Sequence, residues 1–137
     1  MNIGLIMGEV VKLVGKKLTE EFAKVNKLLP MDSFIILNTL YEKDDLIQND
    51  LAEILHQDKS AILRKIDYLQ EQKLVARISS SEDRRQNIIV LTKKGVQTIE
   101  IMRSIEAKVF NDLLIDVSSE NSQTFYNILI SMKTKLG

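Results

Sequence analysis

Residues that interrupt helices are scarce in this chain, and this scarcity constrains its fold more than any other feature. The 137 residues include one proline and five glycines. Because these two residue types most strongly disfavour a helix interior, long helices are expected to dominate. Aromatic residues make up only 5% of the chain, which leaves little material for a large sheet. The sequence therefore predicts one mainly α-helical domain.

The composition excludes several classes of site. The chain has no cysteine, so disulfides, thiolate metal sites and cysteine nucleophiles are ruled out. His56 is the single histidine and is expected to be a turn residue, since no second histidine or cysteine could complete a zinc site with it. A glycine-rich phosphate loop and a Gly-x-Ser-x-Gly elbow are also absent. The chain is thus not expected to be an enzyme or to need a cofactor or metal.

The apolar runs are short. No stretch approaches the ~20 apolar residues of a membrane span, and the first eight residues have no basic leader. We expect a soluble cytoplasmic protein without a membrane partner.

Apolar residues recur every three or four positions at both ends of the chain, which predicts amphipathic helices there. The first runs from Ile3 to about Leu28 and is stopped by Pro30. Asp32 or Ser33 is then expected to cap a second helix. Near the other end, Thr92 is expected to cap a helix of about twenty residues, and Ser118 or Ser119 to open a last one.

The middle of the chain has the outline of a helix-turn-helix. A short helix is expected from about Gln48 to Leu55, followed by a tight break and a helix capped by Asp58 that ends near Gln72. Two segments rich in β-branched residues, 74–79 and 87–91, flank a polar stretch and predict a β-hairpin with a charged tip.

Basic charge is concentrated in this middle part, although the whole chain carries 19 basic and 19 acidic residues. The net charge is −3 over residues 1–56, +4 over residues 57–95 and −1 over residues 96–137. Local basic clusters of this kind bind the phosphate backbone of nucleic acids. A solvated charged face is the alternative explanation.

The predicted helix after Asp58 divides into two faces. At 100° per residue Ile62, Ile66 and Leu69 share one face, whereas Ser60 and Arg64 point the opposite way. The outward face also contains Asp67 and Glu71 further along, and Ala61 and Leu63 lie at its flanks. In a major groove, Arg can bind guanine, Ser a phosphate or base edge, and apolar groups a thymine methyl. A surface helix that merely stays hydrated would show the same pattern.

The hairpin tip has the sequence Glu82-Asp83-Arg84-Arg85. A carboxylate at this spacing can hold a guanidinium in a fixed orientation, which favours insertion of that Arg into a narrow, negative minor groove. A plain salt-bridged turn is again the alternative.

Five short motifs occur in order along the chain. They are Leu51-Ala52-Glu53-Ile54-Leu55, Asp58-Lys59-Ser60 with Arg64 and Leu69, Leu74-Val75-Ala76-Arg77, Asp83-Arg84-Arg85, and Leu91-Thr92-Lys93-Lys94-Gly95. With these motifs the chain resembles the multiple-antibiotic-resistance regulator (MarR) family of winged helix-turn-helix transcription factors over nearly its whole length. The resemblance implies a single domain with a DNA-binding lobe at residues 30–92 and dimerisation helices at residues 1–29 and 93–137.

The resemblance also implies a function. The expected protein is a homodimeric transcriptional regulator, a repressor that binds a pseudo-palindromic double-stranded DNA operator and is released from it by a small-molecule effector. Asp83 would position Arg84 or Arg85 at the minor groove. The residues expected to bind DNA are Lys59, Ser60, Ala61, Leu63, Arg64, Lys65, Asp83, Arg84 and Arg85.

Some positions depart from the family pattern. His56 and Lys73 stand where the family commonly has Gly, so each must adopt or avoid a left-handed conformation at a helix end. Ala61 and Leu63 replace residues that are often Thr and Ser, and Ile47 replaces a capping Thr. A winged-helix module that binds another protein instead of DNA is the alternative function, since the fold serves both purposes.

Overall fold

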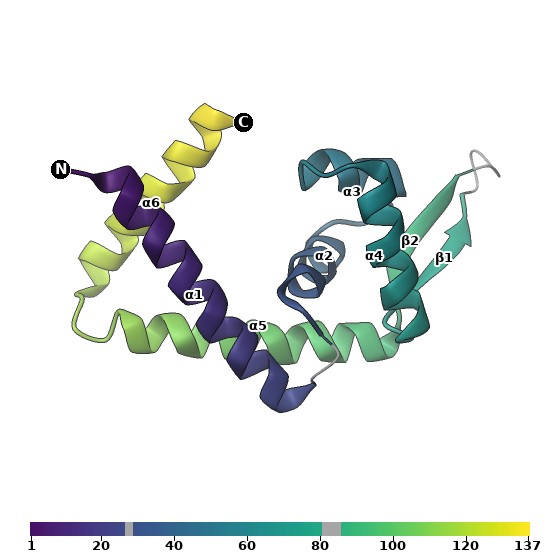
Figure 1. Ribbon diagram of the computed structural model, residues 1–137, viewed down its shortest axis with the longest axis horizontal. Helices are drawn as coiled ribbons and strands as arrows, with labels where there is room; N and C mark the ends of the chain where they lie inside the picture. The colour runs from purple at the N-terminus through teal and green to yellow at the C-terminus, as the bar shows by residue number, and fades with distance from the viewer. Residues whose placement is uncertain (27–28, 81–85) are drawn as a thin grey trace. The chain divides into compact units, whose positions relative to one another are not determined.

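The computed structural model describes residues 1–26, 29–80 and 86–137 (Figure 1). These residues form a mainly α-helical chain with one antiparallel β-hairpin, which confirms the predicted fold class. The elements are α1 (Ile3–Val25), α2 (Met31–Glu42), α3 (Gln48–Ile54), α4 (Lys59–Glu71), β1 (Val75–Ser79), β2 (Asn87–Leu91), α5 (Lys93–Leu113) and α6 (Ser119–Leu136).

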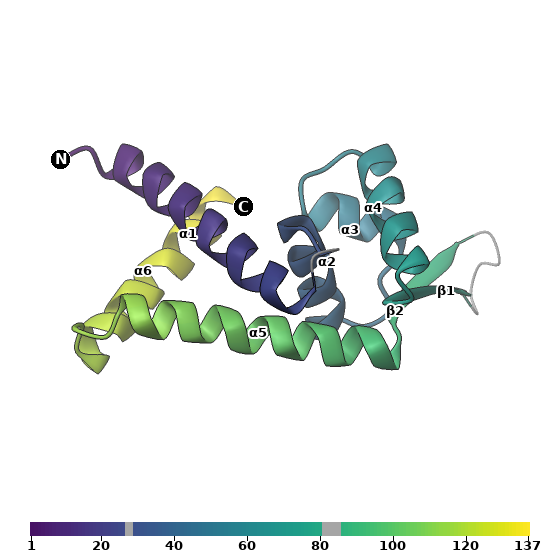
Figure 2. The same ribbon diagram turned by 60° about the horizontal axis from the view of Figure 1, so that its bottom comes forward.

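The chain divides into two compact units, Met1–Glu106 and Ala107–Gly137. The core of the first unit is built from α2, α3, α4, the hairpin and the start of α5 (Figure 2). Phe22 of α1 adds to it, and the centroid of its ring lies 5.1 Å from that of Phe34, with the two rings tilted at 43°. The side chains that are almost wholly inaccessible are Phe22, Ile36, Leu37, Leu51, Ile62, Ile66, Leu69, Leu74, Val75 and Ile99.

The hairpin packs against α2, α3 and α4. Strand β1 pairs with β2 from Val75 opposite Leu91 to Ser79 opposite Asn87. Helix α5 begins directly against the backbone that precedes β1: a Cβ atom on Gly95 would overlap the carbonyl oxygen of Leu74. Only glycine permits this close approach, so Gly95 sets how the helix leaves the hairpin.

The terminal helices keep much apolar surface exposed. In α1 only Leu18 and Phe22 are buried, and six apolar residues of its first half are 50–69% exposed. In the second unit, α6 has no buried residue. The exposed apolar side chains of these two helices include Ile3, Leu5, Ile6, Val10, Val11 and Leu13 in α1 and Phe125, Tyr126, Ile128, Leu129, Ile130 and Leu136 in α6. None of the helices in the described part of the chain has the length and apolar character needed to span a membrane.

The predicted helix starts are partly right. Thr92 Oγ1 accepts the backbone N–H of Gly95 (3.0 Å), and Ser118 Oγ accepts that of Asn121 (3.1 Å), as expected for caps. Asp58 occupies the cap position of α4, but its side chain makes no capping hydrogen bond.

Two predicted boundaries are wrong. Helix α1 ends at Val25 instead of about Leu28. Neither Asp32 nor Ser33 caps α2, because Pro30 holds the cap position and the Ser33 N–H already donates to its carbonyl (2.9 Å). Proline is suited to a helix start, where its missing N–H leaves no unpaired donor.

Two non-glycine residues terminate helices in the left-handed conformation. His56 follows α3 with φ 53°, and Lys73 follows α4 with φ 61°. After α3, the N–H of Gln57 donates to Ala52 O, and after α4 the N–H of Leu74 donates to Leu69 O, both at 3.0 Å. These bonds are the signature of the Schellman motif, which normally takes glycine at the left-handed position. The two departures from the family pattern therefore adopt the strained conformation.

We predict that His56→Gly and Lys73→Gly each raise the free energy of unfolding by about 1 kcal/mol, because glycine relieves the steric penalty of positive φ. Urea unfolding followed by circular dichroism measures the change. Gln72→Gly is the control, since Gln72 has φ −76° and gains nothing from glycine. Equal stability of the His56→Gly, Lys73→Gly and unmodified proteins would contradict the prediction.

Candidate functional site

Helix α4 buries one face and exposes the other, as its sequence predicts. Ile62, Ile66 and Leu69 are 0–1% exposed, and they anchor the helix on the core. Ser60 and Arg64 lie on the exposed side, as do Asp67 and Glu71 further along. Burial of a 3.6-residue stripe thus fixes which side chains face outward.

The first turns of α4 carry exposed polar side chains that have no partner among the described residues. Lys59, Ser60 and Arg64 are exposed, and among the described residues their side chains make no hydrogen bond or ion pair. Leu63 is 41% exposed beside them. Ala61 is half-buried. This set of one hydroxyl, two cations and an aliphatic surface is available for a ligand.

Lys65 is placed differently from these neighbours. Its Nζ donates to Gln57 Oε1 (2.6 Å) and pairs with Asp32 Oδ2 (3.1 Å). The side chain is 29% exposed, so its charge is already partly compensated within the lobe. Lys65, Arg64 and Ala61 also line a cavity of about 250 Å³ between α4 and the start of α2.

Arg77 connects the hairpin to α4 and was not identified as a site residue from the sequence. Its Nη1 donates to Gln70 Oε1 and its Nη2 to Asp67 Oδ1, both at 2.6 Å. The Arg77 side chain is only 19% exposed. Asp67 and Gln70 lie three positions apart on α4, so their side chains are neighbours on the helix surface. This spacing is the feature of the sequence that could have indicated a shared partner. Arg77 therefore clamps β1 against α4 with two charge-assisted hydrogen bonds.

The tip of the hairpin lies outside the described residues. Asp83, Arg84 and Arg85, which the sequence assigns to the minor groove, fall within this segment, and their assignment stays a prediction.

The start of α3 is joined to the hairpin. Ile47 forms an isolated antiparallel bridge with Ile88, and the N–H of Ile89 donates to Leu46 O (2.8 Å). Ile47 has no hydroxyl with which to cap α3, but its N–H donates to Asp50 Oδ2 (2.9 Å). Half of a capping box is therefore present.

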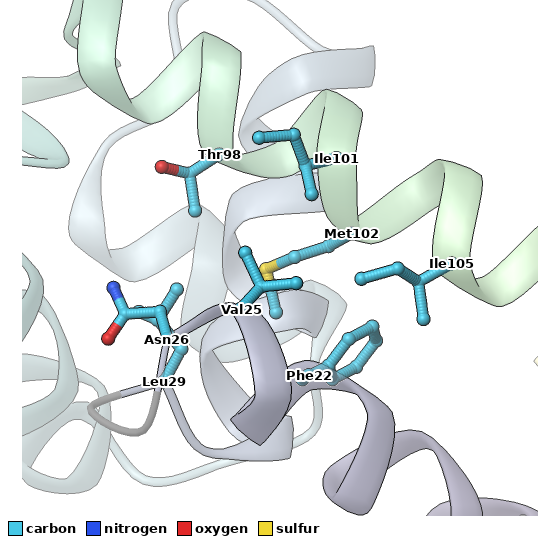
Figure 3. A pocket seen from close by; sticks show the side chains of 8 residues that line it. All are labelled: Phe22, Val25, Asn26, Leu29, Thr98, Ile101, Met102 and Ile105. Carbon is cyan, nitrogen blue, oxygen red and sulfur yellow. The ribbon is translucent and has the colours of Figure 1, made fainter.

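A small apolar cavity of about 120 Å³ lies between the end of α1 and α5 (Figure 3). Phe22, Met102 and Ile105 point toward one another across it, and Asn26 and Thr98 supply its polar groups. Within residues 1–26, 29–80 and 86–137, no group of three or more His, Cys, Asp or Glu side chains could hold a metal ion.

Residues 28–86 match the sequence model of the MarR family, and this segment contains α2, α3, α4 and the hairpin. The resemblance to the MarR family is confirmed. In sequence, the chain is 27% identical over 101 residues to YdgJ of Bacillus subtilis (strain 168), an uncharacterized HTH-type transcriptional regulator. The match covers 74% of this chain and 62% of that relative, so the chain spans less than two thirds of the relative's length.

Solved structures of MepR and MarR share the fold. A MepR–DNA complex from S. aureus has a TM-score of 0.82 at 22% identity, covering 100% of this chain and 99% of MepR. A cysteine-to-serine mutant of MarR from E. coli, complexed with operator DNA, has a TM-score of 0.82 at 18% identity, covering 96% and 94%. At these identities the similarity establishes the winged-helix architecture.

Removal of the Arg77 clamp is predicted to loosen the hairpin. In Arg77→Met the aliphatic stem remains but both hydrogen bonds to α4 are lost, so amide hydrogen exchange in β1 and β2 should accelerate about tenfold. Arg64→Met is the control, because Arg64 makes no contact with the hairpin through hydrogen bonds or ion pairs among the described residues. Unchanged exchange in Arg77→Met would show that the strands are held by backbone pairing alone.

Proposed function

We propose that this protein is a transcriptional regulator that binds a specific double-stranded DNA sequence as a homodimer in the cytoplasm. One observation carries the proposal: Ser60 and Arg64 on the outward face of α4 are exposed and make no side-chain hydrogen bond or ion pair among the described residues. This helix follows α3 after a tight turn, and the N-terminal part of such a helix enters the major groove in helix-turn-helix proteins. The DNA-bound MepR and MarR structures with the same fold support the proposal.

The exposed groups have complementary roles in such a complex. Arg64 would donate to guanine O6 and N7, and Ser60 to a phosphate or base edge. Leu63 and Ala61 offer apolar contact to thymine methyl groups. Lys59 would bind phosphate, whereas Lys65 must first exchange its partner Asp32 for DNA. Asp83, Arg84 and Arg85 are proposed to reach the minor groove.

The exposed apolar side chains of α1 and α6 support the homodimer. Each of the two helices exposes many apolar side chains, and large exposed apolar surface is typical of an association site. A two-fold dimer would present its two α4 helices to half-sites of a pseudo-palindromic operator, about 34 Å apart.

Analytical ultracentrifugation is predicted to show a species of twice the chain mass of 15.7 kDa. Ile128→Glu places a charge on the apolar face of α6 and should weaken the dimer about 100-fold, since an unpaired charge is costly to bury. Lys133→Glu, at another exposed position of α6, is the control and should leave the dimer intact. A wild-type protein that sediments as a single subunit would contradict the proposal.

The proposal includes repression that a small molecule relieves. A ligand can release DNA only by binding the DNA-incompetent geometry more tightly than the competent one. The cavity in Figure 3 adjoins α5, the helix that follows the hairpin. A small molecule bound in this cavity would therefore favour one position of α5 relative to the hairpin.

Arg64→Ala is predicted to weaken binding to the selected DNA by about 1–3 kcal/mol and to relax preference at one base pair. The DNA is obtained by sequencing the duplexes that the purified protein retains from a random pool, and affinities are measured by fluorescence anisotropy at several salt concentrations. If Arg64→Ala lowered the affinity for all DNA sequences equally, Arg64 would be assigned to a phosphate contact instead of a guanine contact. Equal wild-type affinity for selected and unrelated duplexes would favour the alternative, a winged-helix module that binds protein.

A further inference from the structure

An ion pair joins the first turn of α2 to the middle of α4. Asp32 Oδ2 lies 3.1 Å from Lys65 Nζ. The same ammonium group donates to Oε1 of Gln57 (2.6 Å), a residue of the turn between α3 and α4. Asp32 and Lys65 both line the cavity of about 250 Å³ that Arg64 also lines. The carboxylate of Asp32 is therefore close to the cations that α4 would offer to DNA.

Local structure gives Asp32 only a modest role. Pro30 occupies the cap position of α2, and no side chain makes a capping hydrogen bond there. A negative charge in the first turn of a helix favours the helix through its dipole, an effect on stability that would leave DNA binding unchanged. Ion pairs between partly exposed side chains also add little to stability. The main consequence of the pair is therefore that the charge of Lys65 is compensated within the chain.

The two partners differ in how easily they can leave the pair. The Asp32 side chain is 54% exposed, so its carboxylate can return to water at little cost. The Lys65 side chain is 29% exposed, and its hydrogen bond to Gln57 remains when Asp32 leaves. A phosphate oxygen is, like the carboxylate, an anionic acceptor for an ammonium group. It can therefore take the place of the carboxylate while Lys65 stays where it is.

We propose that Asp32 is an internal competitor of the DNA backbone: its carboxylate holds the Lys65 ammonium group in the free protein, and a phosphate must displace it when DNA binds. This inference rests on the proposed DNA-binding function. The exchange replaces one anion at Lys65 by another, so this contact adds little affinity in the unmodified protein. Because phosphate contacts carry no sequence information, Asp32 lowers the affinity for every duplex by the same factor.

The first test removes the carboxylate. Asp32→Asn and Asp32→Ser should each bind DNA about eightfold more tightly at about 0.1 M salt, and the slope of log affinity against log salt should steepen by about 0.9, as expected for one more phosphate contact. The gain should be equal for a duplex selected from the random pool and for an unrelated one. Glu100→Gln, which removes an exposed carboxylate from α5, is the matched control and should bind as the wild type does. Wild-type affinity and slope in the Asp32 variants would overturn the inference.

The second test asks whether the gain acts through Lys65. When Lys65→Met is added to Asp32→Asn, neither charge remains, so affinity and salt slope should return to the wild-type values. A gain that persisted in the double variant would mean that Asp32 only repels DNA directly, and this result would overturn the inference. Misfolding cannot produce the expected result, because the single variants must bind more tightly. If wild-type protein bound no duplex at all, the proposed function itself would fail, and this outcome is distinct from a failure of the Asp32 variants to differ from wild type.

Discussion

Burial of one stripe of α4 is the constraint on which the rest of the site depends. Ile62, Ile66 and Leu69 are almost wholly inaccessible, so rotation of α4 about its axis would expose large apolar side chains. Full burial of each is worth about 1.5–3 kcal/mol. The helix is thereby held in one orientation, and Ser60 and Arg64 are presented outward as a consequence. Arg77 and the start of α3 then position the hairpin with respect to this fixed helix.

A residue in the left-handed conformation lies on each side of α4. His56 and Lys73 each adopt positive φ so that the chain can reverse direction within a few residues. The Schellman bonds offset part of this strain by pairing carbonyls that would otherwise lack a partner. The turns before and after the helix are consequently well defined even without glycine.

The cations of α4 differ in how far their charges are compensated within the chain. Lys59 and Arg64 make no ion pair among the described residues, whereas Lys65 pairs with Asp32 (3.1 Å). The exposed apolar residues of α1 and α6 lie near the two ends of the sequence, whereas the exposed polar groups of α4 lie in its middle.

The sequence by itself determined the helices, the hairpin and the two faces of α4, because these follow from local periodicity and turn residues. It predicted correctly that Ser60 and Arg64 are exposed and that Thr92 and Ser118 cap helices. It misplaced the start of α2, where Pro30 takes the cap position expected for Asp32 or Ser33. Only the tertiary structure decided that Lys65 pairs with Asp32 and that Arg77 bonds to Asp67. Such contacts join residues distant in sequence, so they depend on how the elements pack and leave no periodic signal in the chain.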